Sequence, residues 1–407
     1  MRIPLILATL ILLLQIICDA YLFFIAWRRC RKIFWAKLQL GLGAFFIAYI
    51  VGAIVLFSKT SANAGLPVLM WLLLFYIAVY AGKFTFIIFD LIASIPTVLK
   101  RHRCKRKRKR WNWISWLGAG MATIVFGSII WGAAINRFQL QVNNVDIEIS
   151  DLPDSFNGYR IAQISDLHVG TFGNDTTFVS KMVDRINALD CNLVVFTGDI
   201  VNQHTQELRP FVKTLRRITP PDGVISILGN HDYGDYYKWA SDTDKEVNMQ
   251  ALLDKQIDMG WELLTNNSTT IFSDVPSDSI VIIGVENWGD PPFSQLGDLR
   301  AAYPNLSDSA TKILLTHNPM HWKSEVENND SCNIHLTLSG HTHAMQVNIA
   351  GISPAAIRYP KCWAGRYVSA DGKRTLYVNT GIGTVGLPMR IGATPEITVF
   401  TLKNNKR

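Results

Sequence analysis

Five short polar clusters in the second half of the chain combine residue types that can bind two metal ions. They are Asp166-Leu-His168, Gly198-Asp199, Gly229-Asn-His-Asp232, Thr316-His-Asn318 and Gly340-His-Thr-His343. Four of the five clusters directly follow a short apolar run, and the fifth follows residues 335–338, which predicts that each lies where a buried strand ends. Open α/β sheets build active sites from several strand ends that face one crevice. We therefore expect the five clusters to form a single site.

The elements that must position these clusters alternate between strand-like and helical patterns. The predicted strands and helices of the first part are strands at 159–165, 193–197 and 224–228 and helices at 177–189, 207–217 and 246–259. Further strands are predicted at 138–149, 279–285, 312–316, 334–338, 375–379 and 396–402. Few helical patterns separate the later strands, so this half should be richer in antiparallel pairing.

Charge divides the 407 residues into two unlike parts. Residues 1–134 hold 17 Lys and Arg against two acids, whereas the rest holds 23 bases against 30 acids. The first part therefore carries a net charge of +15 and the rest −7, so the basic character of the chain belongs to the first part. We expect a transmembrane region at 1–134 and one large globular domain at 135–407, which is long enough for a substantial core.

Four long apolar runs precede the globular domain. They cover 4–27, 38–57, 66–93 and 111–134, each near or above the roughly 20 residues that cross a bilayer. Length and weak flanking charge favour a retained anchor over a cleaved signal peptide at the N-terminus. The third run is the least certain in extent, because Lys83 and Asp90 could pair inside the bundle or mark the end of a span.

Two basic clusters set the expected topology. Arg28 to Lys37 holds one of them, and Lys100 to Arg110 holds the other. By the positive-inside rule both lie in the cytoplasm, so four crossings return the globular domain to the extracytoplasmic side. The location expected is the plasma membrane or a bacterial inner membrane. The second cluster could also be read as a nucleic-acid patch, but its apolar flanks favour a juxtamembrane loop, and no specific nucleic acid is expected.

The six cysteines do not suggest a disulfide framework. Only Cys191, Cys332 and Cys362 fall in the globular domain, which leaves room for one pair at most. Cys191 and Cys332 each precede a predicted strand, so we interpret them as small core residues.

The five clusters, in this order, resemble the calcineurin-like metallophosphoesterase superfamily. The segments 152–161, which reads LPDSFNGYRI, and 376–381, which reads LYVNTG, resemble its membrane-associated phosphodiesterase branch, as does Pro395-Glu-Ile397. The resemblance covers about residues 140–402. It implies an α/β fold of two mixed β-sheets packed face to face with flanking helices, here preceded by an all-α transmembrane region of about four helices.

The resemblance also implies a ligand set for two divalent ions, Mn, Fe or Zn. Carried over by position, it puts Asp166, His168 and His343 on one ion, Asn230, His317 and His341 on the other, and Asp199 between them. Imidazole and carboxylate ligands suit such ions, and the clusters contain no cysteine that would indicate a zinc ribbon. Two ions about 4 Å apart clamp phosphate oxygens and activate a bridging hydroxide for in-line attack.

The catalytic residues implied are His231 and Asp232. His231 would donate a proton to the leaving group, and Asp232 would orient its ring. The string at 381–386, GIGTVG, matches a dinucleotide fingerprint, but Leu387-Pro follows where a helix should run, so we expect a glycine loop beside the site. Ala344-Met stands where the family commonly has two glycines, which puts the substrate range in doubt.

The function predicted is a membrane-anchored phosphoesterase acting on phosphodiesters of lipid-linked or cell-envelope substrates. One alternative is a broad phosphomonoesterase or nucleotide hydrolase, because the metal core handles all phosphoesters and loops set selectivity. The other is a catalytically silent sensor or scaffold. The intact ligand set with His231 favours an enzyme.

Overall fold

The computed structural model describes residues 5–30, 33–59, 66–98, 109–289, 295–303 and 310–404. The chain divides into two compact units, residues 1–134 with 386–389 and residues 135–385 with 390–407. Each unit has its own elements and its own buried clusters of side chains.

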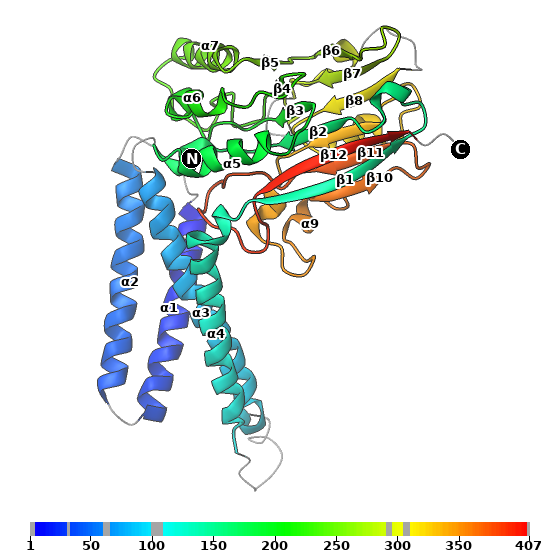
Figure 1. Cartoon of the computed structure of the whole chain (residues 1–407). Coiled ribbons are helices and arrows are strands. Elements are labelled where there is room, and N and C mark those ends of the chain that lie inside the picture. The colour runs from blue at the N-terminus through cyan, green and yellow to red at the C-terminus, as the bar shows by residue number, and fades with distance from the viewer. Residues whose placement is uncertain are drawn as a thin grey trace. The chain divides into compact units, whose positions relative to one another are not determined.

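The first unit consists of four long helices (Figure 1). They are α1 (Leu5–Cys30), α2 (Ile33–Lys59), α3 (Leu66–Val98) and α4 (Asn112–Ala134). Each contains a stretch long and apolar enough to span a bilayer, which confirms the four predicted spans. α1 packs along α2, and α3 packs along α4.

Ion pairs link these helices, but Lys83 and Asp90 do not pair with each other. The proposed contact between Lys83 and Asp90 is wrong, and α3 has no break near either residue. Lys83 Nζ lies 2.7 Å from Asp19 Oδ1 of α1, and Asp90 pairs with Arg29 and Arg110. Each carboxylate therefore finds its cation on another segment, as an unpaired charge among apolar helices is costly.

The pairing of Asp90 also orders the ends of the bundle. Arg29 closes α1, and Arg110 precedes α4, yet both contact the same carboxylate near the end of α3. Figure 1 shows α1 ending and α2 beginning at the same end at which α3 ends and α4 begins. Residues from both basic clusters therefore lie at one end of this unit, as the predicted topology requires.

The second unit contains two six-stranded mixed sheets. One has the order β1-β12-β2-β3-β4-β5, and the other has the order β10-β11-β9-β8-β7-β6. The strands of the first sheet are β1 (Gln141–Ile149), β12 (Glu396–Asn404), β2 (Arg160–Ile164), β3 (Leu193–Thr197), β4 (Val224–Ile227) and β5 (Trp261–Leu263). Those of the second are β10 (Gly365–Val368), β11 (Thr375–Val378), β9 (Leu336–Ser339), β8 (Thr311–Leu315), β7 (Ser279–Gly284) and β6 (Asn267–Phe272).

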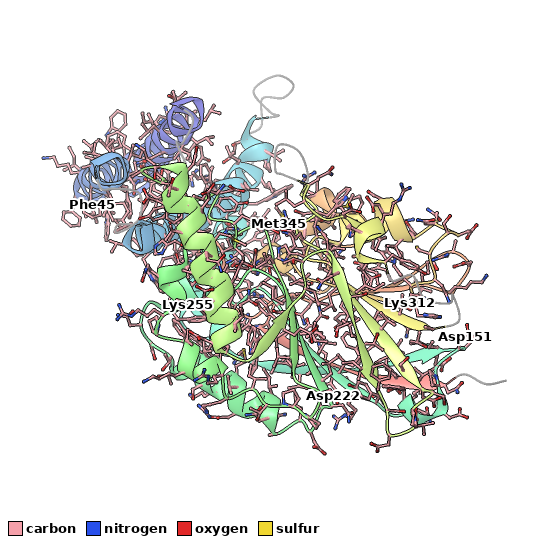
Figure 2. All side chains as sticks on the ribbon, turned by 90° about the horizontal axis from the view of Figure 1, so that it is seen from above. Phe45, Asp151, Asp222, Lys255, Lys312 and Met345 are labelled. Atoms are coloured by element: carbon pink, nitrogen blue, oxygen red, sulfur yellow. The ribbon has the colours of Figure 1, made fainter. Side chains whose placement is uncertain are left out.

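The two sheets pack face to face around one apolar core, which confirms the predicted fold class. Ile161 and Val195 of the first sheet share this core with Ile282 and Leu315 of the second. Seen from above, side chains fill the interior of this unit (Figure 2). Because the central strands are covered on both faces, β3 and β8 are buried along their whole length.

Helices cover the outer faces of the sheets. α5 (Thr177–Asn187), α6 (Val212–Leu215) and α7 (Asp242–Asp258) pack on the first sheet through a second core, and Figure 1 shows them along one side of it. α8 (Leu299–Ala302) packs into the cluster outside the second sheet, and α9 (Ala355–Arg358) is a further short helix. In α5, Phe178, Val179, Met182, Val183 and Ile186 are buried at helical spacing.

Some predicted elements differ from those observed. The helix expected at 207–217 is a short turn at Thr205–Leu208 followed by α6, because Pro210 between them has no N–H to continue a helix. The expectation of antiparallel pairing in the later half holds only in part. Every antiparallel pair of strands includes a strand from that half, but β7, β8, β9 and β11 pair with one another in parallel. β5, β6 and β10, which were not predicted, are all edge strands.

The cysteines behave as core residues. Cys191 and Cys332 are buried, as predicted, and so is Cys362. No disulfide joins any of these three, so the one pair that the sequence allowed is not formed.

Candidate metal centre

The five clusters follow the carboxyl ends of parallel strands from both sheets. Asp166, Asp199 and Asn230 come after β2, β3 and β4, whereas His317 and His341 come after β8 and β9. Since parallel strands end at the same edge, the clusters of one sheet lie side by side, and the facing sheets bring the two sets together.

Several of these residues adopt left-handed backbone conformations. Asp166, His168, Asp199, His341 and His343 all have positive φ, between 42° and 74°. Such conformations are uncommon for residues other than glycine and persist where surrounding structure over-determines them. The sharp turns they make direct side chains from the strand ends toward one point.

One group of donor atoms is formed by Asp166, His168 and His343. The Nε2 atoms of the two histidines lie 3.1 Å apart, and His343 Nε2 lies 3.2 Å from Asp166 Oδ1. The distance from His168 Nε2 to Asp166 Oδ1 is 3.9 Å. All three residues are buried.

A second group is formed by Asp199, His317 and His341 with Asn230. His317 Nε2 lies 3.2 Å from Asp199 Oδ2, 3.1 Å from Asn230 Oδ1 and 3.2 Å from His341 Nδ1. Asp199 Oδ2 also lies 3.5 Å from His168 Nε2 of the first group. Asp199 is therefore the residue that faces both groups.

The spacing of these donors fits metal ions. Ligands bound at 2.0–2.2 Å to a tetrahedral or octahedral ion lie about 3.0–3.5 Å from one another, which is the separation of most donor pairs here. Imidazole nitrogens that face each other at 3.1–3.2 Å need a shared cation or a shared proton between them. The donor set of nitrogen and oxygen suits Mn, Fe or Zn.

The electrostatics of the site point the same way. Burial alone would raise the pKa of the Asp199 carboxyl, but His317 and His231 hold that pKa well below its usual range. Burial would lower the pKa of His317, yet Asp199 and Asp166 raise it to about 9. Two buried carboxylates thus attract positive charge strongly, and divalent ions can supply it in place of protons.

Glycines permit the close approach of the two clusters that follow β4 and β9. A Cβ atom on Gly229 would lie 2.2 Å from Asp199 Oδ1, and one on Gly340 would lie 2.3 Å from Asp166 Oδ2. Substitution at either position would push a carboxylate out of the site.

The predicted pairing of Asp232 with the His231 ring is wrong. The Asp232 carboxylate instead accepts hydrogen bonds from the backbone N–H groups of Asp199, Ile200, Val201 and Gly229. Each of its two oxygens accepts two of these hydrogen bonds, and neither bonds to the His231 ring. Asp232 therefore holds the loop after β3 against the turn after β4.

The His231 ring is oriented by other groups. Its Nδ1 lies 2.6 Å from the carbonyl oxygen of Asn202, and because a carbonyl can only accept, Nδ1 carries the proton. The Tyr236 ring stacks on His231 with centroids 4.1 Å apart and planes at 15°. Nε2 is then the ring atom available for proton exchange.

Three residues that the sequence did not single out contact the predicted ligands. Tyr236 Oη accepts from Asn230 Nδ2 at 2.8 Å, Tyr359 Oη lies 3.0 Å from His341 Nε2, and Arg390 Nη2 lies 3.1 Å from His343 Nδ1. Each contact uses the atom that does not face the metal position, and so fixes the ligand's orientation. The only sequence signal near any of them is the glycine string before Arg390.

That glycine string lies beside the site, as predicted. Gly381 has a φ of 77° and approaches Asp166 and His343, and Gly383 N donates to Asp166 O. Arg390 is fully buried and also donates from Nε to the Gly383 carbonyl at 2.8 Å. The loop therefore packs against one of the two donor groups.

Ala344 and Met345, which stand where the family commonly has two glycines, lie in an unusual turn. His343, Ala344, Met345 and Gln346 all have positive φ, between 46° and 59°. Met345 is 48% exposed, and Figure 2 labels it. Four consecutive left-handed residues without glycine store strain next to a predicted ligand.

Removing the Tyr359 hydroxyl is expected to weaken metal binding at the second donor group. Tyr359→Phe leaves His341 Nε2 without the hydroxyl contact, and loss of such an orienting contact costs roughly 10- to 100-fold in metal affinity. Titration of the metal-free protein with Mn or Zn, followed by calorimetry, measures the change. Tyr159→Phe is the control, because it removes a hydroxyl bonded to Asp222 at the starts of β2 and β4, the strand ends opposite to the clusters. Equal affinities in both variants would refute the orienting role.

Fold and site together define a metallophosphoesterase, and comparison with known proteins agrees. Residues 159–345 match the family model described as calcineurin-like phosphoesterase. Residues 1–137 match a model described as a probable calcineurin-like phosphoesterase transmembrane domain. The chain belongs to the calcineurin-like metallophosphoesterases, in a form that carries four transmembrane helices.

Three relatives illustrate the range of similar proteins. The metallophosphoesterase YkuE of Bacillus subtilis, named as uncharacterized, is 30% identical over 297 residues, which is 71% of this chain and 94% of YkuE. A transmembrane protein with metallophosphoesterase domain from Danio rerio is 29% identical, over 65% of this chain and 57% of its own length. The UDP-2,3-diacylglucosamine pyrophosphatase LpxG of Chlamydia muridarum is 24% identical, over 67% of this chain and 92% of LpxG.

These findings establish the class of the protein. The protein is a membrane-anchored, metal-dependent hydrolase of the calcineurin-like superfamily, a group that uses a dinuclear metal centre.

Proposed function

We propose that this enzyme hydrolyses phosphodiesters of lipid-linked or cell-envelope substrates on the extracytoplasmic side of the membrane. The observation that carries the proposal is the pair of donor groups that share Asp199. Two divalent ions held there would neutralise phosphate oxygens and activate a water molecule.

The seven predicted ligands form two sets, one for each ion. Asp166, His168 and His343 would hold one ion, and Asn230, His317 and His341 would hold the other. Asp199 contributes to both, since its Oδ2 faces histidines of both groups. The identity of the ions is expected to be Mn, Fe or Zn, because all donors are nitrogen or oxygen.

His231 acts as the proton donor to the leaving alcohol. Its backbone N donates to Asp199 Oδ1 at 2.8 Å, and its ring lies edge-on to His168 with centroids 4.8 Å apart. These contacts support a position for the ring beside the two donor groups. Nδ1 is held by the Asn202 carbonyl, so Nε2 is the atom that delivers the proton.

Two lines of support favour a lipid-linked substrate. LpxG is named for a pyrophosphatase activity on UDP-2,3-diacylglucosamine, a diacylated sugar nucleotide. About 30 residues separate the end of α4 at Ala134 from Asp166. So short a connection keeps the enzyme in the same layer as membrane substrates and raises their effective concentration.

The test is a hydrolysis panel on the purified full-length protein. Lipid-linked diesters, soluble diesters, phosphomonoesters and nucleotide diphosphate sugars are compared under defined Mn, Fe and Zn loading. We expect the highest kcat/KM on bilayer-embedded diesters. A preference for monoesters or soluble nucleotides would support the broad hydrolase instead, and inactivity of fully loaded protein on every substrate would support the scaffold.

The extracytoplasmic placement follows from the basic clusters. Arg29 and Arg110 lie at the end of the bundle that the positive-inside rule assigns to the cytoplasm, and an even number of spans returns the chain to the other side.

Reporter fusions are expected to show the two regions on opposite sides. Alkaline phosphatase fused after Arg407 should be active because it folds outside the cytoplasm, whereas green fluorescent protein inserted within 100–110 should fluoresce because it folds inside. The opposite pattern would reverse the topology. Signals that place both on one side would mean that α4 does not cross the membrane.

A further inference from the structure

The segment between β9 and β10 exposes four large apolar side chains. Ile349 is 61% exposed, Ile352 is 76% exposed and Ile357 of α9 is 88% exposed, and Met345 is exposed as well. Figure 1 draws this segment in orange, together with α9. Single apolar side chains on a surface are ordinary, whereas several in one short segment indicate a surface that meets an apolar partner. The proposed hydrolysis does not use these side chains.

Two of the four flank a tight turn. Ile349 N donates to the Ile352 carbonyl at 2.9 Å, and Ile352 N donates to the Ile349 carbonyl at 3.0 Å, so Ala350 and Gly351 form the end of the turn. Asn348 Oδ1 also accepts from Gly351 N at 3.0 Å. These bonds hold the turn without help from the isoleucine side chains, which point to no partner that the turn requires. We call residues 349–352 the apolar tip.

The apolar tip is tied to the place where the chain leaves the last span. Asn136, two residues after the end of α4, donates from Nδ2 to the Arg390 carbonyl at 2.8 Å. The next residue, Ile391, donates to the Gln346 carbonyl and accepts from Asn348 N, both at 2.8 Å. Because α4 is long and apolar enough to cross a bilayer, the bilayer surface lies close to Asn136. These bonds therefore keep the tip near that surface.

The charge of the surrounding sequence suits a lipid surface. Residues 331–370 contain three Lys or Arg residues, Arg358, Lys361 and Arg366, and no Asp or Glu. All three basic residues are exposed. Anionic headgroups attract basic side chains and repel acidic ones. Exposed apolar residues beside basic residues are the combination by which protein segments bind to the interface of a bilayer.

We propose that the apolar tip inserts into the interfacial region of the bilayer beside the last span. The occupant is the lipid surface, because the tip is bonded to the segment that follows α4 and lies among basic residues. In the sequence, the predicted ligand His343 precedes the tip, and Tyr359, which contacts His341, follows it. Insertion therefore holds the metal centre beside the phosphates of membrane lipids. This catalytic consequence rests on the proposed function, whereas the insertion itself does not.

A fluorescent probe at the tip measures insertion directly. The full-length protein is reconstituted into lipid nanodiscs, with a polarity-sensitive fluorescent amino acid in place of Ala350, which is exposed. Lipids brominated on their acyl chains serve as quenchers. We expect a blue-shifted emission that the brominated lipids quench, and stronger quenching as the fraction of anionic lipid rises.

The same probe at Ala370 is the matched control. Ala370 is an exposed alanine in the turn between β10 and β11. Because β11 runs parallel to β9, this turn lies at the opposite end of the sheet from the cluster that follows β9. The probe at Ala370 should keep the emission of a group in water, and brominated lipids should not quench it.

Substitutions at the tip test the catalytic consequence. The measured quantity is the ratio of kcat/KM on a bilayer-embedded diester to kcat/KM on a water-soluble diester. I349S/I352S should lower this ratio about 10-fold, because it removes two apolar side chains that enter the interface. I349L/I352L should keep the ratio, since a lipid surface requires apolar groups and not one shape. Ile257→Ser, at a 70% exposed isoleucine of α7, is the control and should also keep it.

The outcomes separate the insertion from the function. Equal emission and no quenching at Ala350 and Ala370 overturn the insertion. A blue shift at Ala350 that brominated lipids do not quench also overturns it, because a second copy or another protein then covers the tip. Quenching at Ala350 with an unchanged ratio in I349S/I352S supports the insertion and overturns its catalytic consequence. Failure to cleave any diester overturns the diesterase proposal alone, because quenching is measured without substrate.

Discussion

Replacing Asp199 with alanine is expected to abolish hydrolysis and to lower the occupancy of both metal positions. Asp199 Oδ2 lies 3.5 Å from His168 and 3.2 Å from His317, so one substitution removes a donor from each group. The loss should exceed the roughly 100- to 1,000-fold that follows removal of a single electrostatic donor. Metal analysis of the purified variant, alongside kcat/KM on the best substrate of the panel, measures both effects.

The matched comparison is a conservative change at the same carboxylate. Asp199→Asn keeps the shape and one oxygen but loses the charge, and we expect intermediate metal content. Circular dichroism controls for folding, since Asp199 also accepts the His231 backbone N–H. Full occupancy of both positions in Asp199→Ala would show that the carboxylate is not shared.

His231→Ala is expected to slow hydrolysis by about 100- to 10,000-fold while both metals stay bound. The ring lies beside the donor groups, but its Nδ1 is engaged by Asn202, so its removal takes away a proton donor and no ligand. The loss should grow as the leaving alcohol becomes less acidic. A series of diesters with leaving groups of graded acidity measures this dependence.

Two comparisons test the assignment. His204→Ala removes a histidine outside the clusters and should leave the leaving-group dependence unchanged. Asp232→Asn disturbs the loop between β3 and β4, so it should lower thermal stability without reproducing the steep dependence on the leaving group. Equal rates for His231→Ala and the unmodified enzyme on a poor leaving group would assign the proton transfer to another group.

The helices and strands that the sequence predicts are those with a strong local pattern of apolar residues. The four spans and the buried central strands were found because long apolar runs and short β-branched runs are visible without knowledge of their partners. β6 and β10 are not predicted because they are partly exposed edge strands and neither contains an apolar run longer than two residues. Their pairing depends on neighbours that sequence alone does not supply.

Polar contacts were less predictable than polar residues. The sequence shows Lys83 and Asp90 as charges inside α3, but their partners Asp19 and Arg29 come from α1, about 60 residues away. An ion pair requires only proximity of opposite charges, and helix packing decides which charges meet. Periodicity within one helix does not contain that information.

The sequence by itself determined the type and order of the candidate ligands. Asp166, Asp199 and Asn230 follow apolar runs that must be strands, and ligand chemistry is a property of residue type. Tertiary structure alone decided how those ligands are held. Asp232 bonds to the loop after β3 and not to His231, and Arg390 reaches His343 from a distant loop. Such choices depend on the positions of segments far apart in the chain, because a hydrogen bond forms only between groups brought within about 3 Å by the packing of the whole domain.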